Sequence, residues 1–322
     1  MKYGVCAISN GMNKYLSAYI NFLTKNLKPV RPLKIILDCS NGAVGPIAHK
    51  VFKNKKFLNF KIINSAPNGN FPAHGPDPLK KDAFKKLKTV VLKEKADLGV
   101  IFDADGDRAF LSDNRGRKTN PDAIARLLIW HLKPKKVVVD ARTGWLVHQF
   151  KIENLKFKIF PSKVGRYFVQ KLMKENNADF GAERSGHYYF KKFYFFDSGI
   201  FAATQAINAV SKLPYSLADF VDLLPQYYSS ETNFKLNAKY DYSAILRKIE
   251  DRYKNFAVAT SRLDGLKMEI KKPSGGFWFN IRLSNTEPVI RLTIEAQSPK
   301  ILATEGRNLV NLLKKHEERR PF

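Results

Sequence analysis

The sequence predicts an α/β protein with two mixed-sheet α/β domains followed by a small α+β domain. The chain has 322 residues, which is long for one compact core and enough for two or three domains. Short apolar runs alternate with helical segments twice in the first two thirds of the chain, a pattern typical of parallel strands joined by helices. The last third instead has successive strands. We therefore expect domains at residues 1–116, 117–228 and 229–322.

The first domain starts with an amphipathic helix, whose apolar side chains recur at helical spacing. The apolar run KIILD then leads into the loop CSNGAVG and a second helical segment, so that strand, glycine-containing loop and helix follow one another. A further strand, helix and strand complete a βαβ pattern. Helices are expected at residues 13–27, 45–52 and 79–95, and strands at 34–38, 60–64 and 96–103.

The second domain repeats this plan after a turn at residues 113–117. Asn120 is a good N-cap, and Pro121 suits the first position of the helix that follows. Strands are expected at 136–140 and 157–162, each followed by a helical stretch, and a further helix at 199–213. Prolines and polar residues mark a boundary near residues 213–232.

The third domain has a different texture, because strand-like segments follow one another directly. They are separated by turn residues, and one terminal helix closes the chain. The strands are expected at residues 255–265, 266–272, 276–284 and 289–296, and the helix at 299–316.

Composition limits the class of protein. No apolar run approaches about 18 residues, so no transmembrane helix is predicted, and the start of the chain lacks the features of a signal peptide. Cys6 and Cys39 are the only cysteines, which is typical of a reducing compartment and predicts a cytoplasmic protein. The net charge of +27 could favour nucleic acid, but the lysines are spread along the whole chain, so we favour an anionic small substrate.

The segment DADGDR, residues 103–108, is the sharpest motif. Asp103, Asp105 and Asp107 alternate over five residues directly after an apolar strand, and Gly106 lets the loop curl. Three carboxylates at this spacing repel one another unless a cation lies between them, and a hard divalent ion such as Mg²⁺ suits their oxygens. Arg108 could reach a phosphate or fix one of the carboxylates.

Two further loops carry groups that suit a phosphorylated sugar. In GAERSGH, residues 181–187, side chains two residues apart point the same way, and such a cluster can bind sugar hydroxyls; these are Glu183, Ser185 and His187. In RLSNTEPVIR, residues 282–291, two arginines flank a turn rich in hydroxyl and amide groups that could grip a phosphate; these are Arg282, Ser284, Asn285, Thr286 and Arg291.

Two basic residues lie where α/β proteins collect ligands. Arg142 follows the strand at 136–140, and Lys163 follows the strand at 157–162, so both lie at the carboxyl ends of strands. Each could act as an acid or base, or hold a phosphate. The alternative is that both are ordinary surface cations.

Together these loops resemble the phosphohexomutases, the phosphomannomutase/phosphoglucomutase family. DADGDR is similar to the family's D-G-D-G-D-R metal loop, GAERSGH to its G-G-E-x-S-G-H sugar loop, and RLSNTEP to its R-x-S-N/G-T-E-P phosphate loop. The resemblance implies Mg²⁺ on the three aspartates, sugar hydroxyls on Glu183 and Ser185, and substrate phosphate on the loop at 282–286. It also implies hexose phosphates as substrates, interconverted between 1- and 6-phosphate through a hexose 1,6-bisphosphate.

The chain departs from the family pattern in two ways. The T-A-S-H-N-P-type loop that carries the family's phosphoserine has no counterpart here, so we expect a truncated mutase whose N-terminal phosphoserine domain is missing or supplied separately. Arg166 stands where a histidine is common, and Ala182 replaces a glycine. The alternative is a phosphosugar-binding remnant without activity. A phosphatase of the haloacid dehalogenase type is disfavoured, because it would need a threonine at the position of Asp107.

Overall fold

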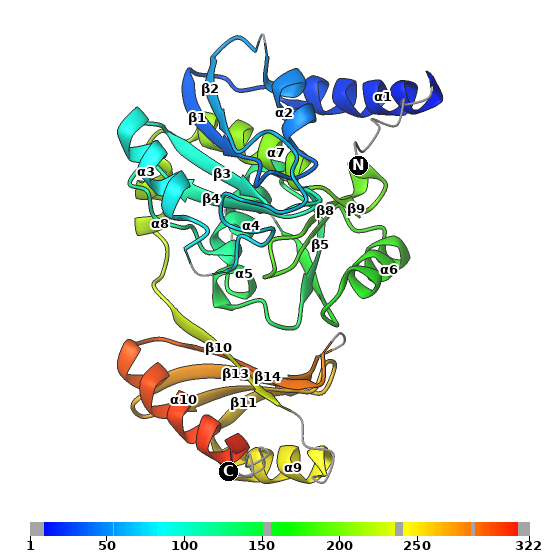
Figure 1. Cartoon of the computed structure of the whole chain (residues 1–322). Coiled ribbons are helices and arrows are strands. Elements are labelled where there is room, and N and C mark those ends of the chain that lie inside the picture. Colours follow the sequence, from blue (N-terminus) through cyan, green and yellow to red (C-terminus); the bar gives the residue numbers. More distant parts are fainter. Residues whose placement is uncertain are drawn as a thin grey trace.

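The computed structural model describes residues 10–53, 55–80, 82–150, 156–235, 241–284 and 287–314. It contains three sheets, and we use them to define the first, second and third domains (Figure 1). The predictions for Asn285 and Thr286 lie outside the described residues. Among the described residues, no helix is long and apolar enough to cross a membrane.

The first domain is a mixed four-stranded sheet in the order β2-β1-β3-β4. β1 pairs in parallel with β2 and β3, whereas β3 and β4 are antiparallel. Helix α3 covers one face, with Leu87 and Val91 against Ile36 and Ile101. The elements are β1 (Leu33–Asp38), β2 (Leu58–Ile63), β3 (Leu98–Phe102), β4 (Ala109–Asp113), α1 (Asn10–Asn26), α2 (Gly45–Phe52) and α3 (Lys85–Glu94).

The second domain repeats this order and adds one strand, giving β6-β5-β7-β8-β9. β5 is parallel to β6 and β7, and the last two pairings are antiparallel. The prediction that this domain follows the plan of the first is therefore confirmed. Its elements are β5 (Lys136–Asp140), β6 (Lys158–Ser162), β7 (Phe180–Ala182), β8 (Tyr188–Phe190), β9 (Phe196–Asp197), α4 (Pro121–Leu132), α5 (Trp145–His148), α6 (Arg166–Asn176), α7 (Gly199–Lys212) and α8 (Leu217–Asp222).

One hydrophobic core joins the first two domains. Leu37 and Val100 of the first sheet belong to the same buried cluster as Val139 and Phe180 of the second. Helices α4 and α7 pack against each other within this cluster, and α7 also contacts β3 and β4. The shared core thus fixes the position of one sheet relative to the other, so the loops at their strand ends lie side by side.

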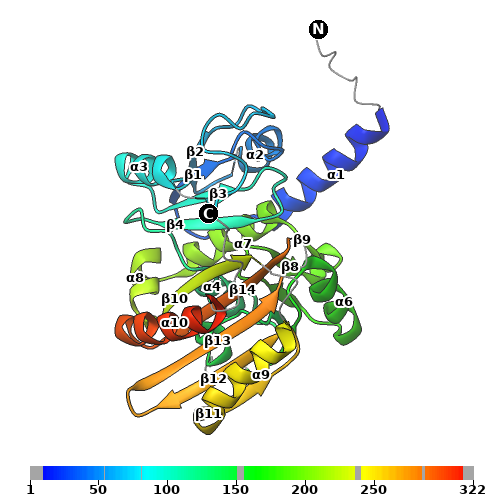
Figure 2. The same ribbon diagram turned by 60° about the horizontal axis from the view of Figure 1, so that its bottom comes forward.

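The third domain is an antiparallel five-stranded sheet in the order β10-β14-β13-β12-β11. Its helices lie on the face away from the second domain, so the other face looks towards it (Figure 1). Figure 2 shows β10, the segment that leads out of the second domain, beside β14. The elements are β10 (Tyr228–Lys235), β11 (Ala257–Ser261), β12 (Leu266–Lys272), β13 (Gly275–Leu283), β14 (Val289–Ala296), α9 (Tyr242–Tyr253) and α10 (Pro299–Lys314).

Two elements of the third domain were not predicted. Strand β10 begins inside the segment expected as a polar boundary and pairs with β14 from Tyr228 to Lys235; its mostly exposed side chains give little strand signal. Helix α9 was also not expected, because only one terminal helix was predicted. Its buried Ile245, Ile249 and Tyr253 recur at helical spacing, so its signal was present in the sequence.

Candidate active site

The three aspartates of the segment 103–108 converge at the carboxyl end of β3. One carboxylate oxygen from each of Asp103, Asp105 and Asp107 lies within 4.8 Å of the others. Gly106 has a φ of +78°, a conformation that an L side chain rarely adopts, and this lets the loop curl. Asp103 is buried, whereas Asp105 is exposed. The predicted carboxylate cluster therefore forms at the edge of a buried strand.

The glycine-containing loop after β1 shapes this cluster. Ala43 donates a backbone hydrogen bond of 2.7 Å to the carbonyl of Ala104. A Cβ atom on Gly42 would lie only 2.2 Å from the same oxygen, so any larger residue there would displace the metal loop. Asp103 is held in turn by the backbone N–H groups of Gly106 and Arg108, at 3.2 and 3.1 Å.

This donor set suits a hard cation. Oδ1 of Asp107 is buried and has no hydrogen-bond partner among the described residues, so one anionic oxygen of the cluster is free to bind a cation. Carboxylate oxygens are the ligands that Mg²⁺ prefers. The residues present therefore fit Mg²⁺, with Asp103, Asp105 and Asp107 as its candidate ligands.

Two arginines balance the charge of these aspartates. Arg108 contacts Asp103 through Nε and donates to Oδ1 of Asp77 at 3.1 Å. Arg166 contacts Asp107 through Nη2 and donates to Oδ2 of Asp197 at 3.0 Å. The guanidinium of Arg166 thus bridges Asp107 in the segment 103–108 and Asp197 in the second domain.

His187 shares the Asp197 carboxylate with Arg166. Its Nδ1 is 2.7 Å from Oδ2 of Asp197 and 3.7 Å from Oδ1 of Asp107. The β-bridge between Arg108 and His187 ties the segment 181–187 to the segment 103–108, and the N–H of Ala109 donates to the carbonyl of Gly186 at 3.1 Å. The two loops that the sequence singled out are therefore neighbours, although they belong to different sheets.

Glu183, which was predicted to bind a sugar hydroxyl, is buried and already hydrogen-bonded within the protein. Its carboxylate accepts hydrogen bonds from the N–H of Gly165 at 2.8 Å and from the hydroxyl of Tyr189 at 2.6 Å. Burial, followed by the charge of Asp140, raises the pKa of Glu183. Each carboxylate oxygen keeps one free lone pair. The predicted contact with a sugar hydroxyl stays a prediction.

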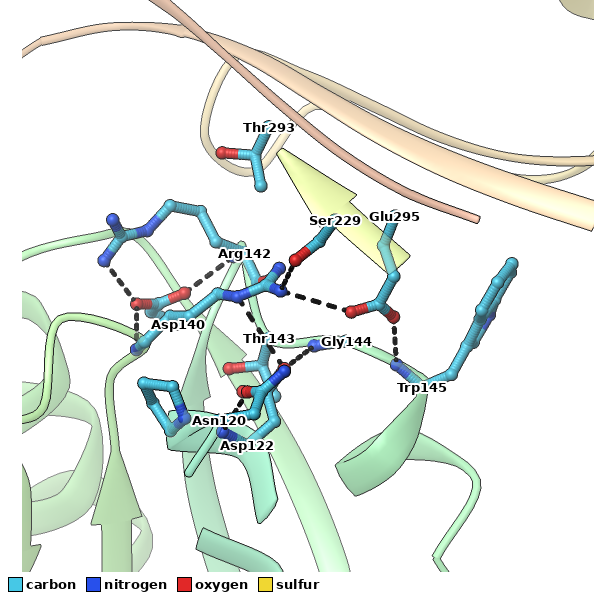
Figure 3. A network of polar contacts seen from close by, with 12 residues as sticks. Asn120, Asp122, Asp140, Arg142, Thr143, Gly144, Trp145, Ser229, Thr293 and Glu295 are labelled. Carbon is cyan, nitrogen blue, oxygen red and sulfur yellow. Dashed lines mark hydrogen bonds and ion pairs between the residues drawn. The ribbon is translucent and has the colours of Figure 1, made fainter. Parts of the chain in front are cut away.

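Arg142 is buried beside Asp140 at the carboxyl end of β5. Its Nη2 donates to Oδ2 of Asp140 at 2.8 Å. Burial by itself would raise the pKa of Asp140, but the charge of Arg142 and the hydrogen bonds to this carboxylate lower it. Arg142 is therefore a fixed cation, and it lies next to the third domain (Figure 3).

Arg184 joins the second and third domains and was not predicted. Its Nη1 donates to the carbonyl of Arg142 at 3.2 Å, and its Nη2 donates to Oγ of Ser229 at 2.8 Å and to Oε2 of Glu295 at 3.3 Å. Figure 3 shows Ser229 and Glu295 facing the loop that carries Arg142 and Trp145. Arg184 lies within the segment 181–187, and this position was the only hint of a role in the sequence. Its partners are more than 40 residues away in the chain, so the contacts themselves could not be predicted.

The predicted phosphate loop contributes two arginines on neighbouring strands. Arg282 on β13 and Arg291 on β14 are directly paired in register. Burial, followed by the charge of Arg142, lowers the pKa of Arg282, and the charge of Arg291 also contributes. The Nε atoms of Arg142, Arg282 and Arg291 are buried, and among the described residues none has a hydrogen-bond partner. Other guanidinium nitrogens of these three arginines are hydrogen-bonded, so the buried donors left open in the described part of the chain are the three Nε groups.

A cavity of about 830 Å³ lies between the three domains. Of the predicted site residues, Arg108, Arg142, Ser185 and Arg291 line it. Lys163 does not: it is exposed, and its Nζ lies 5.6 Å from the centre of the Phe168 ring. Further lining residues that the sequence analysis did not single out are Asp77, Lys118, Arg184, Ser229, Ser230, Glu231 and Thr293. Most of them come from polar segments without a motif.

Comparisons with known proteins agree along nearly the whole chain. Three phosphoglucomutase/phosphomannomutase family models match in succession: alpha/beta/alpha domain II over residues 13–116, alpha/beta/alpha domain III over 120–228, and the C-terminal domain over 231–310. A phosphomannomutase of Methanocaldococcus jannaschii is 36% identical over 305 residues, covering 93% of this chain and 65% of that protein. A phosphomannomutase of Escherichia coli is 30% identical over 309 residues, covering 92% and 66%.

Solved structures share the fold. A phosphoglucomutase/phosphomannomutase family protein of Burkholderia thailandensis has a TM-score of 0.78 and 25% identity, covering 94% of this chain and 64% of that one. The N-acetylphosphoglucosamine mutase of Aspergillus fumigatus, solved in complex with GlcNAc-6P and magnesium, has a TM-score of 0.67 and 15% identity, covering 94% and 66%. The chain thus spans 65–66% of the length of the two phosphomannomutases.

Proposed function

This chain belongs to the phosphoglucomutase/phosphomannomutase family, and we propose that it carries the metal, sugar and phosphate sites of a phosphohexomutase. Such an enzyme is an isomerase that interconverts hexose 1-phosphate and hexose 6-phosphate. The observation that carries the proposal is the cavity between the three domains, where Arg108, Arg142, Ser185 and Arg291 meet. Groups of this kind suit a ligand with both a phosphate and hydroxyl groups.

The arginines supply the phosphate site. A phosphate group offers several acceptor oxygens, and guanidinium groups bind it through paired, charge-assisted hydrogen bonds. The buried Nε atoms of Arg142, Arg282 and Arg291 need such acceptors, because a buried donor left unpaired costs about 1–3 kcal/mol. Binding a phosphate there would satisfy donors that have no partner in the described part of the chain. Ser284, Asn285 and Thr286 would complete this site on the proposal.

The other loops would position the sugar and the transferred group. Ser185 would donate to sugar hydroxyls from the cavity wall, and Arg108 would hold a phosphate next to the aspartates. Mg²⁺ bound by these aspartates would supply positive charge that neutralises the phosphoryl oxygens. Two phosphate positions, one at Arg108 and one between Arg142 and Arg291, would let a hexose 1,6-bisphosphate bind in either orientation.

The phosphoryl donor on this proposal is a phosphoserine in a domain that is not among these 322 residues. The P–O bond of the phosphoserine would break as a new P–O bond forms to a hydroxyl of the hexose phosphate. The proton of that hydroxyl would end on the serine oxygen that is released. In the second step the bisphosphate would return its other phosphoryl group to the serine, whose hydroxyl proton would end on the sugar oxygen. The hexose phosphates, the phosphoserine partner and a cytoplasmic location remain predictions.

A coupled mutase assay tests this function. Mannose 1-phosphate and glucose 1-phosphate would be offered to the chain with Mg²⁺ and a trace of hexose bisphosphate, with and without a family phosphoserine domain added as a separate protein. We expect turnover with the added domain, reduced roughly 10²-fold or more in an Asp105→Asn variant, which lacks one metal ligand. Asp251→Asn is the matched control, because Asp251 is exposed and pairs only with Lys254 among the described residues.

The outcomes separate the possible roles. Turnover without any added domain would mean that this chain has a phosphoryl carrier of its own. No turnover under any condition, together with measurable binding of hexose phosphates, would favour a binding protein without activity. If the chain showed no turnover and no binding of hexose phosphates, the proposed function would be refuted.

A further inference from the structure

We infer that Glu231 is an internal counter-anion of the arginine cluster: in the ligand-free protein its carboxylate occupies the place of a ligand phosphate, which must displace it. The inference rests on the proposed function, because it takes the arginine-lined cavity to be a phosphate site. It adds a residue that sets how tightly this site binds anions. Glu231 lies on β10, the strand that leads from the second domain into the third, and it lines the cavity.

The carboxylate of Glu231 lies between two arginines of different domains. Its Oε2 is 3.7 Å from Nη1 of Arg142, on the second domain, and its Oε1 is 3.6 Å from Nη1 of Arg291, on the third. Each oxygen thus faces one guanidinium, as two oxygens of a bridging phosphate would. Thr293 donates a long hydrogen bond of 3.4 Å to Oε2. The position is the one that an anion between the two domains would take.

These contacts are loose in comparison with the other partners of the same arginines. Distances of 3.6 and 3.7 Å are ion pairs and exceed the length of a hydrogen bond. Arg142 has a close hydrogen bond of 2.8 Å with the buried Asp140, and Arg291 has one of 2.6 Å with Glu287. The side chain of Glu231 is 37% exposed, so it can leave towards solvent without unfolding its surroundings. Glu231 is therefore the displaceable partner.

A phosphate can offer Arg142 and Arg291 hydrogen-bond acceptors that the carboxylate of Glu231 does not provide. The Nε atoms of Arg142 and Arg291 are buried and lack hydrogen-bond partners among the described residues, although the carboxylate is close by. A carboxylate has two oxygens, and here neither lies within hydrogen-bond distance of these arginines. A phosphate has more acceptor oxygens and a larger charge, so it can satisfy donors that the carboxylate leaves unpaired.

A counter-anion between the arginines offsets part of their repulsion when no ligand is bound. The charges of Arg142 and Arg291, after burial, help to lower the pKa of Arg282, so positive charge is concentrated here. The carboxylate of Glu231, on the edge strand β10, reduces this repulsion in the ligand-free state. The same carboxylate then competes with the ligand, and its removal should increase the affinity for phosphate.

A rival explanation predicts the opposite sign. If Glu231 instead holds the two guanidinium groups in the geometry that a ligand needs, its removal should weaken binding. The test is isothermal titration calorimetry of the 322-residue chain with inorganic phosphate at pH 8 and 0.15 M salt, where long-range charge effects are largely screened. Glu231→Gln removes the charge, and its amide oxygen can still accept from Thr293. Glu250→Gln is the matched control, because Glu250 is on the same domain and pairs with Arg262 away from the cavity.

We expect Glu231→Gln to bind phosphate about three- to tenfold more tightly than the wild type, since two partly exposed ion pairs compete with the ligand. Glu250→Gln should change the affinity less than twofold. Glu231→Asp, whose shorter side chain cannot reach both arginines, should also tighten binding and provides a second variant if Glu231→Gln folds poorly. A thermal melt of each variant checks folding.

The outcomes distinguish the role of Glu231 from the existence of the phosphate site. Unchanged or weaker phosphate binding in the Glu231 variants, with binding intact in the wild type, would overturn the role of Glu231 and leave the phosphate site standing. An equal gain in Glu250→Gln would also overturn it, because the effect would then be one of net charge. No binding by any of the proteins would overturn the phosphate site and this inference together.

Discussion

Replacing Arg184 by methionine should weaken the contact between the second and third domains and lower the free energy of unfolding. Arg184 is 12% exposed and its partner Glu295 is 1% exposed, so the ion pair between them is almost fully removed from water. The same guanidinium lies 3.9 Å from the buried Asp122. Methionine keeps much of the side-chain volume and removes the charge, so two buried carboxylates lose their neighbouring cation.

The expected cost follows from this burial. Removing one partner of a buried ion pair costs about 3–5 kcal/mol, because the other charge stays buried without compensation. Glu295→Gln should cost less, about 1–3 kcal/mol. Its amide oxygen can still accept the hydrogen bonds of 2.9 Å that Oε1 receives from the N–H of Trp145 and from Nε1 of Trp278. In the double variant we expect the two costs to overlap by about 1–3 kcal/mol.

The assay is urea-induced unfolding at pH 8, followed by tryptophan fluorescence and by far-UV circular dichroism. Trp145 and Trp278 contact Glu295 from different domains, so their fluorescence reports on this interface. Two probes are needed because a multidomain chain need not unfold in one step. Arg247→Met is the matched control: its ion pair with Asp241 is exposed at the surface, and its removal should cost less than about 0.5 kcal/mol.

The pH dependence provides an independent check. Burial raises the pKa of Asp122 to about 6, although the charge of Arg184 acts in the opposite direction. A carboxyl group with a raised pKa in the folded state contributes stability that is present at low pH and lost as the pH rises through that pKa. Without Arg184 the pKa of Asp122 rises further, so Arg184→Met should destabilise the protein more at pH 8 than at pH 5.

Two results would refute this reasoning. A cost below about 1 kcal/mol for Arg184→Met would mean that the buried pair contributes no more than a surface pair. Fully additive costs in the double variant would mean that Arg184 and Glu295 do not interact energetically.

Two further predictions concern the metal loop and the strand beside it. Arg166→Ala should bind Mg²⁺ about three- to tenfold more tightly in a calorimetric titration, because the guanidinium contacts Asp107 and competes with the cation; weaker binding would mean that Arg166 holds Asp107 in place. In a Cys6→Ser variant the thiol reagent DTNB should label Cys39 only after unfolding, since burial raises the pKa of this thiol to about 12. Rapid labelling of the native protein would contradict the buried position of Cys39.

The sequence determined the local parts of the protein well. Helix α2 and strands β5, β12 and β14 have the predicted bounds, because apolar spacing and turn residues specify such short segments by themselves. The convergence of Asp103, Asp105 and Asp107 was also predictable, since these carboxylates are only two residues apart and come from one turn; their binding of Mg²⁺ stays a prediction. The family motifs then fixed the order of the domains.

The tertiary structure decided what brings these local parts together. β10 has few apolar side chains, and its strand conformation depends on the backbone of β14, about 60 residues later in the chain. Glu231 and Glu295 belong to no motif, yet they meet Arg142 and Arg184 across the domain boundary. The physical reason is that charge pairing and burial depend on distances between segments far apart in the sequence, which no local pattern records.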